Sequence, residues 1–384
     1  MHNRISVQAL CGCLGCSATA APKLACVPAP TSAVFAAPRP HLAGLSRRSF
    51  AAGAAAAFGL GTAIAAGMPG RLFAQAKPHR IDVHHHLSPP LWVEALKKAR
   101  LDTPPVNSWT PQRSLDDMDK AGTATAILSV TQPAIGFLDA PEAAALARAS
   151  NEYAKKLTQD HPGRFGMFAA LPLPHVDESL KEIAYALDTL KADGIGLLTS
   201  YDEKYLGDPA FTPVMDELNR RKATVYTHPA TPACCVNLAG IDPRYIEFAT
   251  DTTRAIASLI FSRTSARVPD INFIFSHAGG SITSLTERFT VQIISEPKFK
   301  DFTGAGVMAE LKRFYYDTAQ VSNPIAMAGL TRMVAVSQIV FGTDYPYRSG
   351  VEDVNGLAGF FGPDDLKLIE RENALKLLPR WRAA

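Results

Sequence analysis

Short apolar runs of five to seven residues recur along the chain from residue 81 onward. Runs of this length, bounded by turn residues, are typical of buried strands. The predicted strands are Ile81–His86, Thr125–Val130, Phe165–Leu171, Gly194–Thr199, Ala223–His228, Ile271–Ser276, Phe314–Thr318 and Gln338–Thr343. Longer amphipathic stretches lie between them. In residues 177–192, for example, Leu180, Ile183, Leu187 and Leu190 repeat at helical spacing.

This alternation predicts a single (β/α)₈ TIM barrel, because eight strands are each followed by a helical or loop segment. A doubly wound open sheet is the alternative α/β fold. It would need a Gly-rich phosphate-binding turn after an early strand, whereas the first strand here ends in histidines. Residues 77–384 contain no internal repeat or linker, so we expect one domain.

Residues 1–76 have the composition of an export leader. Ser46-Arg47-Arg48-Ser49-Phe50 precedes a soft apolar run at 51–67, and Ala74-Gln75-Ala76 follows as a cleavage site. An arginine pair in this order is typical of twin-arginine signals. The run is short and rich in Ala and Gly for a membrane span, although an uncleaved anchor is the alternative. We therefore expect export to the periplasm and no stable membrane insertion after cleavage near Lys77.

Charge and cysteine content separate this leader from the rest of the chain. The net charge is +3, but residues 1–76 hold six basic and no acidic side chains, so residues 77–384 are slightly acidic. Such a domain has no charge surplus for nucleic acid. Four of the six cysteines also lie in the leader. The other two, Cys234 and Cys235, are adjacent, and because adjacent cysteines rarely reach disulfide geometry we expect no disulfide.

Histidines mark the end of the first predicted strand. Side chains alternate across a strand, so Asp82, His84 and His86 are expected on one face, with Val83 and His85 on the other. If the first face looks into the barrel, two imidazoles about 7 Å apart along the strand can reach one ion. The His-x-His pattern alone is a weak signal, and a solvated polar strand end is the alternative.

Three further polar residues end other strands: His228 the fifth, His277 the sixth and Asp344 the eighth. The carboxyl ends of barrel strands form the rim where such folds carry their chemistry. Neutral imidazoles and a carboxylate suit one divalent metal, Zn²⁺ first, with Mn²⁺, Fe²⁺ or Co²⁺ as substitutes. A catalytic site keeps one position open, so one of these side chains should serve proton transfer instead. The remaining histidines, His79, His161 and His175, are expected at the surface.

Sequence motifs place these residues in a known family. They include IDVHHHLSPP (81–90), FIFSHAGGSI (273–282) and FGTDYPY (341–347). Over residues 81–377 the chain resembles the amidohydrolase superfamily, in the branch of aminocarboxymuconate-semialdehyde decarboxylase. Segments 114–129 and 199–211 are most similar to the 6-methylsalicylate decarboxylase type.

The resemblance implies roles for individual residues and, because relatives commonly dimerise, a homodimer. The implied metal ligands are His84, His86, His228 and Asp344. His277 is the implied acid/base residue, and Asp344 is implied to share in proton transfer. Residues 194–200 lack the lysine that bridges two metals in binuclear members, which favours one ion. The stretch before Trp109 lacks the arginine that binds substrate carboxylates in the muconate enzyme, and Arg288 is expected in a structural ion pair.

The leading functional interpretation is metal-dependent, non-oxidative decarboxylation of a small aromatic or unsaturated carboxylic acid. Hydrolysis of a lactone, amide or ester is the first alternative, because the same residues could activate water. An exported metal- or ligand-binding protein without turnover is the second. Trp92, Trp109 and Tyr347 could stack on an aromatic substrate, although isolated aromatic residues more often serve packing.

Overall fold

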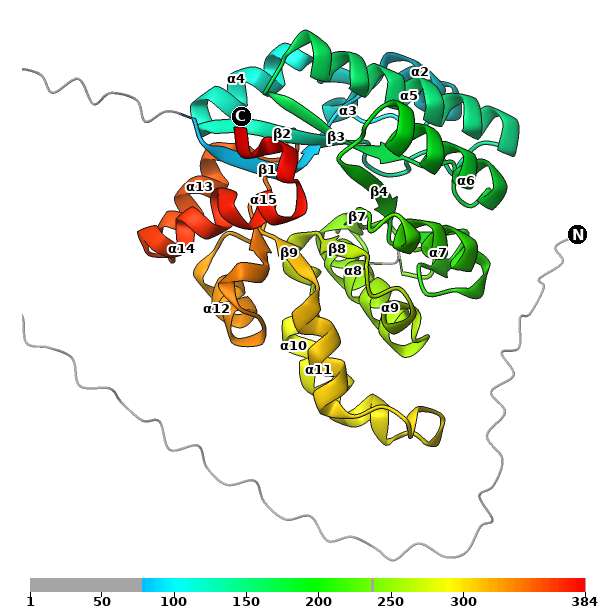
Figure 1. The fold of residues 1–384 in the computed structure, drawn as a ribbon, viewed down its shortest axis with the longest axis vertical. Helices are drawn as coiled ribbons and strands as arrows, with labels where there is room; N and C mark the ends of the chain where they lie inside the picture. The colour runs from blue at the N-terminus through cyan, green and yellow to red at the C-terminus, as the bar shows by residue number, and fades with distance from the viewer. Residues whose placement is uncertain (1–77, 236–237, 384) are drawn as a thin grey trace, which may run out of the picture. The chain divides into compact units, whose positions relative to one another are not determined.

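A barrel of parallel strands forms the centre of the computed structural model, which describes residues 78–235 and 238–383 (Figure 1). In spatial order its strands are β1 (Arg80–His86), β2 (Thr123–Ser129), β3 (Phe165–Ala170), β4 (Gly194–Leu198), β7 (Thr224–His228), β8 (Asn272–Phe275), β9 (Tyr315–Asp317) and β10 (Ile339–Val340). Val83 N donates to Phe341 O (2.9 Å) and His86 N to Tyr345 O (2.8 Å), which joins β1 to the chain after β10. The predicted barrel is confirmed, with a shorter eighth strand than expected.

Helices cover the outside of the strands (Figure 1). They are α2 (Pro90–Ala99), α3 (Pro104–Ser108), α4 (Pro111–Ala121), α5 (Ala140–Asp160), α6 (Val176–Ala184), α7 (Thr212–Arg220), α8 (Arg244–Phe261), α9 (Thr264–Arg267), α10 (Ile282–Glu287), α11 (Gly304–Arg313), α12 (Pro324–Met333), α13 (Gly350–Ala358), α14 (Pro363–Lys367) and α15 (Asn373–Leu377). Local sequence sets their ends. In α4 the Thr110 side chain accepts from Arg113 N, and Gly122 ends the helix with φ 65°.

Two local elements differ from the sequence prediction. The helix expected over 177–192 is α6 followed by a π-helical turn at Tyr185–Thr189. A small antiparallel hairpin, β5 (Ser200–Tyr201) with β6 (Lys204–Tyr205), follows β4 and was not predicted. Strands of two residues are too short to give a periodic signal in the sequence.

The C-terminal segment closes the end of the barrel where the strands begin. Ile81, Phe168 and Tyr226 from the barrel interior pack in one cluster with Leu377 and Trp381. Thr224, the first residue of β7, donates its hydroxyl to Leu377 O (3.2 Å). This end of the interior is filled with apolar side chains, so any polar site inside the barrel lies toward the carboxyl ends of the strands.

An irregularity in β1 corrects the predicted alternation of its side chains. Asp82 pairs with Ala126 and His85 pairs with Leu128. Between these two pairs β1 contains one residue more than β2, which is a β-bulge. Val83 packs in the barrel interior, whereas Asp82 Oδ2 lies 3.0 Å from Nδ1 of His85. The prediction that Asp82 shares a face with His84 is therefore wrong. The bulge shifts the inward/outward alternation by one residue after Val83. His84 and His86 therefore face inward as predicted, although Val83 does so too.

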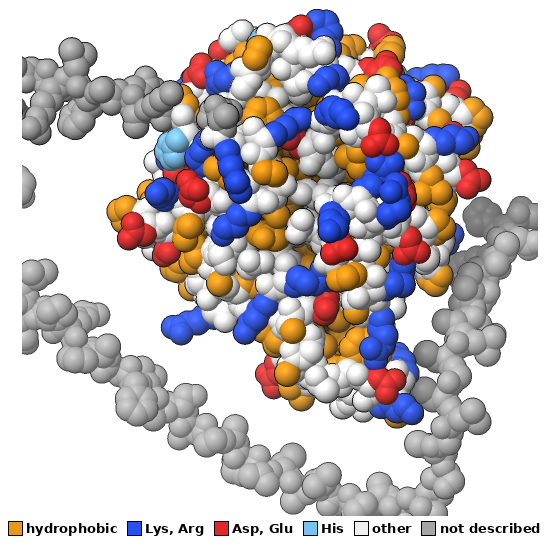
Figure 2. Space-filling view, viewed as in Figure 1, with side chains coloured by type: hydrophobic (Ala, Val, Ile, Leu, Met, Phe, Trp, Pro, Cys, Tyr) orange, Lys and Arg blue, Asp and Glu red, His pale blue; other side chains and the backbone are white. Residues whose placement is uncertain are grey.

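Charged side chains of both signs are interspersed on the face shown in Figure 2. This agrees with the near balance of charges in residues 77–384. Within the described ranges, no helix has both the length and the apolar composition needed to cross a bilayer. The predicted leader, residues 1–76, lies outside the part of the chain that the structure describes.

Candidate metal centre

Four of the residues singled out in the sequence meet inside the barrel. His84, His86, His228 and Asp344 are all buried, and one potential ligand atom from each lies within 4.8 Å of the other three. They come from β1, β7 and the turn after β10, which are far apart in the sequence. The structure thus brings together the whole predicted ligand set, while its binding of an ion stays a prediction.

Hydrogen bonds leave the same nitrogen of each histidine facing the common point. His84 Nδ1 lies 2.8 Å from Asp317 Oδ2, His86 Nδ1 3.2 Å from Ser129 O, and His228 Nδ1 2.8 Å from Pro229 O. Each of these oxygens is an acceptor, so each Nδ1 carries the hydrogen and each Nε2 offers a lone pair.

The geometry of these lone pairs fits a cation. Nε2 of His84 and Nε2 of His86 are 3.2 Å apart, and the Nδ1 atom of each ring already carries a hydrogen. Asp344 Oδ1 lies 3.2 Å from the first and 2.9 Å from the second. Lone pairs that converge in this way repel one another unless a positive charge lies between them. The donor set therefore fits one divalent ion bound by nitrogen and oxygen.

Burial and neighbouring charges set the pKa values in the cluster. Burial acts to lower the pKa of His84, but the Asp317 and Asp344 carboxylates outweigh it and raise that pKa to about 10. Burial, together with His86 and His84, lowers the pKa of His228 well below its usual value. Burial opposes ionisation of Asp344, yet His84 and hydrogen bonds from the histidines hold its pKa well below the usual range. The raised pKa means that, with no metal ion bound, a second proton on Nε2 of His84 supplies positive charge to the cluster, and a bound metal ion would replace this proton. His228 stays neutral and able to act as a ligand.

His277 lies beside this cluster and not within it. Its Nε2 is 3.4 Å from Asp344 Oδ2, the oxygen directed away from His84 and His86. The His277 ring centroid is 5.1 Å from that of His84. Gly279 and Gly280 follow with φ of 75° and 70°, as expected of a tight turn after β8. His277 thus reaches the cavity without being one of the four converging residues, and its acid/base role stays a prediction.

Asp317 is the main site residue that the sequence analysis missed. It ends β9 and is fully buried. Its Oδ2 faces His84 Nδ1, and its Oδ1 accepts from the backbone N of His277 (2.8 Å). The available signal was its position, because Asp317 ends the seventh barrel strand just as His228 ends the fifth.

A cavity of about 360 Å³ opens onto the cluster. A cavity of this size suits a small organic ligand. Its lining residues are Thr103, Thr131, Gln132, His228, Arg244, Tyr245, Phe248, Ala249, His277, Gln320, Val321, Asp344 and Tyr347. Tyr347 thus lines the cavity, whereas Trp92 is fully buried in a separate cluster and donates to Ala134 O. Trp109 is also buried and donates to Ser114.

Two aromatic rings of this cavity stand over the predicted ligands. The centroid of Phe248 is 5.8 Å from that of His228, and the centroid of Tyr347 is 5.8 Å from that of His86. Both pairs meet edge to face. A planar molecule between these rings would therefore lie next to the cluster.

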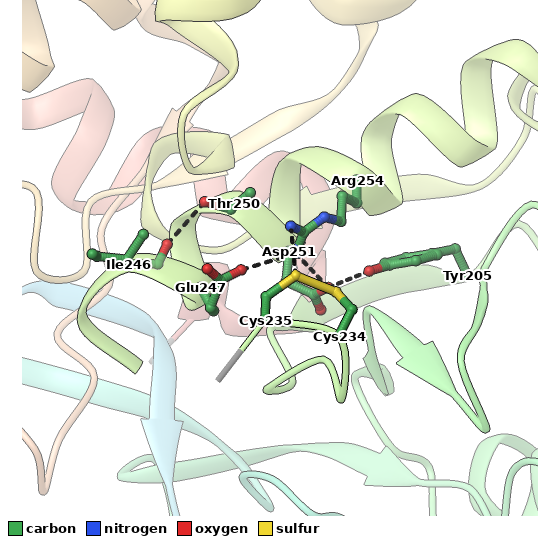
Figure 3. The surroundings of a disulfide bond; sticks show 8 residues. All are labelled: Tyr205, Cys234, Cys235, Ile246, Glu247, Thr250, Asp251 and Arg254. Atoms are coloured by element: carbon green, nitrogen blue, oxygen red, sulfur yellow. Dashed lines mark hydrogen bonds and ion pairs between the residues drawn. A yellow bond between two sulfur atoms is a disulfide. The ribbon is translucent and has the colours of Figure 1, made fainter. Parts of the chain in front are cut away.

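The prediction for the two adjacent cysteines is wrong. Cys234 and Cys235 form a disulfide in the loop after β7, with their Cα atoms 3.8 Å apart (Figure 3). The prediction relied on the Cα separation of ordinary disulfides, which neighbours along the chain cannot reach. The bridge lies outside the lining of the large cavity and next to α8, where Arg254 Nη2 is 3.6 Å from Cys235 Sγ.

Several residues that were left out of the predicted site have partners outside the cluster. His79 contacts Glu370 (2.7 Å), and His175 Nε2 lies 3.0 Å from Leu138 O. His85 contacts Ser114 of α4 (3.0 Å) and so faces the helix layer as expected. Arg288 donates to Gln292 at 3.4 Å, and within residues 78–235 and 238–383 it does not form the predicted ion pair.

Comparisons with known proteins identify the family of the chain. The sequence model of the amidohydrolase family matches residues 81–380. "Decarboxylase yanB" of Aspergillus niger is 38% identical over 327 residues, covering 79% of this chain and 88% of the relative. The 6-methylsalicylic acid decarboxylase of Penicillium expansum is 34% identical over 318 residues, covering 79% and 97%. A dihydroxybenzoic acid decarboxylase from Polaromonas sp. JS666, solved with bound manganese, has a TM-score of 0.71 at 20% identity, covering 79% and 98%.

Proposed function

Because the chain belongs to the amidohydrolase family, whose model spans almost the whole barrel, we propose that it is a metal-dependent decarboxylase of a small hydroxylated aromatic acid. The observation that carries the proposal is the set of three Nε2 atoms and one carboxylate oxygen, with His277 beside it at the cavity. The relatives named decarboxylases, which are 38% and 34% identical, support the reaction class.

The ligand set favours a single ion. His84, His86, His228 and Asp344 would hold it, and β4 ends without the lysine that a second metal would need. Zn²⁺ suits this mixture of imidazole and carboxylate, and the manganese of the Polaromonas enzyme makes Mn²⁺ the first substitute to compare. The bound ion supplies Lewis acidity toward the substrate carboxylate and an adjacent hydroxyl.

The protein's own residues would orient the substrate and move one proton. Phe248 and Tyr347 hold the aromatic ring between them over the cluster. His277 holds a proton at Nε2, facing both Asp344 Oδ2 and the cavity, and delivers it to the ring carbon that bears the carboxylate. The bond from that carbon to the carboxylate then breaks, its electron pair returns to the ring, and CO₂ leaves.

The test is CO₂ release from a panel of hydroxybenzoates, including 6-methylsalicylate, before and after chelation, with reactions run in D₂O. We expect CO₂ in equal amount to the decarboxylated product, one deuterium at the former carboxylate position, and loss of activity on chelation. Turnover of lactones or esters without CO₂ would instead assign the chain to hydrolysis. No turnover of either panel by metal-loaded protein would leave the binding-protein alternative.

We also propose that the protein is exported through a twin-arginine pathway after folding. Arg47 and Arg48, the apolar run at 51–67 and the Ala-Gln-Ala site support this. Replacing both arginines with lysine keeps the charge and removes the recognised pair. Fractionation should then move the protein from the periplasm to the cytoplasm, and an unchanged distribution would contradict export by this route.

A further inference from the structure

Gln320 occupies a position in the cavity that the proposed mechanism does not use. It follows β9 by three residues and lines the cavity together with His277 and Asp344. Its side chain is exposed, unlike those of the buried ligand set. An exposed glutamine on a loop is ordinarily replaceable, so its function here depends on what holds it and what it contacts.

The backbone of Gln320 has the same unusual conformation as two residues of the site. Its φ is 58°, and those of His277 and Asp344 are 54° and 65°. For a residue other than glycine, this left-handed backbone conformation costs about 1 kcal/mol or more of conformational free energy. Such residues cluster at functional sites. Three neighbouring barrel strands, β8, β9 and β10, are each followed by one such residue lining the cavity. Gln320 is the member of this group without an assigned role.

The Gln320 carboxamide donates a hydrogen bond to Asp344. Its Nε2 contacts Oδ2, the oxygen that also faces His277. The other oxygen, Oδ1, faces the Nε2 atoms of His84 and His86. A carboxylate only accepts hydrogen bonds, so the amide nitrogen of Gln320 must be the group turned toward it. The two oxygens of Asp344 are thereby given different partners.

Another residue must hold the Asp344 carboxylate if its two oxygens are to keep different partners. The terminal torsion of aspartate is broad and twofold, so the side chain alone does not fix which oxygen points where. An Asp344 carboxylate that is free to rotate could turn both oxygens toward an ion in the cluster. No oxygen would then remain directed at His277 and the cavity. Gln320 opposes that rotation by binding Oδ2 from the cavity side.

We propose that Gln320 is a positioning residue that holds Asp344 with one oxygen toward the metal and the other toward His277 and the substrate. This inference rests on the proposed function in one respect, since it takes the four-residue cluster to bind an ion. It does not depend on which acid is the substrate, or on whether the reaction is decarboxylation.

The test compares cobalt-loaded Gln320→Leu with the wild type, using the visible absorption of Co²⁺ as a readout of coordination. Leucine has a similar size and no donor. We expect one Co²⁺ per chain in both proteins, and a weaker visible band in the variant because the second carboxylate oxygen joins the coordination. On the substrate, kcat should fall about 10–100-fold with little change in KM.

Two further variants complete the design. Gln320→Asn is a safeguard for folding, because asparagine tolerates the left-handed region well, and its shorter amide should reproduce the spectral change. Gln112→Leu is the matched control, since Gln112 makes a similar hydrogen bond to Asp116 (2.8 Å) on an exposed part of α4. Its spectrum and kcat should equal those of the wild type.

Identical cobalt spectra for the wild type and both Gln320 variants would overturn the proposal. Full recovery of variant activity by excess metal would also overturn it, because Gln320 would then act only in metal retention. A third outcome separates the two proposals. If the wild type binds cobalt and releases no CO₂, but its spectrum still differs from those of the Gln320 variants, the proposed reaction is refuted and the positioning role of Gln320 is supported.

Discussion

At the scale of single residues, the site depends on side chains that fix other side chains. Asp317 is the clearest case, because one buried carboxylate contacts both the imidazole of His84 and the backbone N of His277. The sequence analysis identified His84, His86, His228, His277 and Asp344 from their places at strand ends. It missed Asp317 although that residue also ends a strand. It did not identify Gln320 or Phe248, because their importance follows from contacts between segments that no motif spacing describes.

Replacing Asp317 with asparagine should weaken metal binding about 10–100-fold. Asparagine keeps the size but presents at most one acceptor oxygen to the two donors, His84 Nδ1 and His277 N. Calorimetric titration of the metal-free variant with Zn²⁺ measures the effect. Asp364→Asn, on the exposed start of α14, is the control. An unchanged dissociation constant would show that Asp317 does not orient His84.

Replacing His277 with asparagine should lower kcat about 10²–10⁴-fold and leave one metal per chain. The imidazole lies at the cavity, 3.4 Å from Asp344 Oδ2, and is not one of the converging ligand atoms. Steady-state kinetics together with metal analysis separate the two properties. Loss of the metal in this variant would make His277 a ligand, and unchanged kcat would remove it from the chemistry.

At the scale of elements, the turns after the strands place the site residues. The strand pattern predicted the barrel because eight apolar runs were separated by helical stretches. It could not predict the bulge in β1, since an extra residue shows only when β1 pairs with β2. The turn after β8 was recognisable from its two glycines, but its packing partner, α8, was not.

Replacing Gly280 with alanine should destabilise the protein by about 2–4 kcal/mol. Gly280 has φ 70°, and a Cβ there would lie 1.8 Å from Ala249 O in α8, the helix that carries Phe248. Thermal unfolding measures the loss. Gly362→Ala is the matched control, because Gly362 has an ordinary φ of −74° and no atom within 4 Å of an added Cβ. Equal melting temperatures for the two variants would contradict this account of the turn.

At the scale of the whole molecule, the charges divide the chain into a basic N-terminal segment, residues 1–76, and a slightly acidic remainder, residues 77–384. The sequence did not indicate which charged side chains become buried on folding, or how burial changes their pKa values. Asp353 in α13 is fully buried. Its Oδ1 accepts from Ser322 (2.8 Å), whereas within the described chain its Oδ2 has no hydrogen-bond partner. Burial raises the pKa of Asp353 to about 8.

This raised pKa predicts how stability depends on pH. The folded protein holds the Asp353 proton more tightly than the unfolded chain does, so its contribution to stability falls as pH rises from about 4 to about 8 and is then constant. Asp353→Asn imitates the protonated acid. Its stability relative to wild type should therefore increase over this range, by up to about 5 kcal/mol, since each pKa unit corresponds to about 1.4 kcal/mol. Melting temperatures at several pH values measure this, and a difference independent of pH would contradict it.

The central claim is that one divalent ion, bound by His84, His86, His228 and Asp344, makes the barrel a decarboxylase. Titrating the metal-free chain with Zn²⁺ or Mn²⁺ while recording CO₂ release from a hydroxybenzoate tests it most directly. We predict a linear rise that ends sharply at one ion per chain, and no rise for His86→Ala at the same metal concentration. CO₂ release without metal, or a rise that continues to two ions per chain, would contradict the claim.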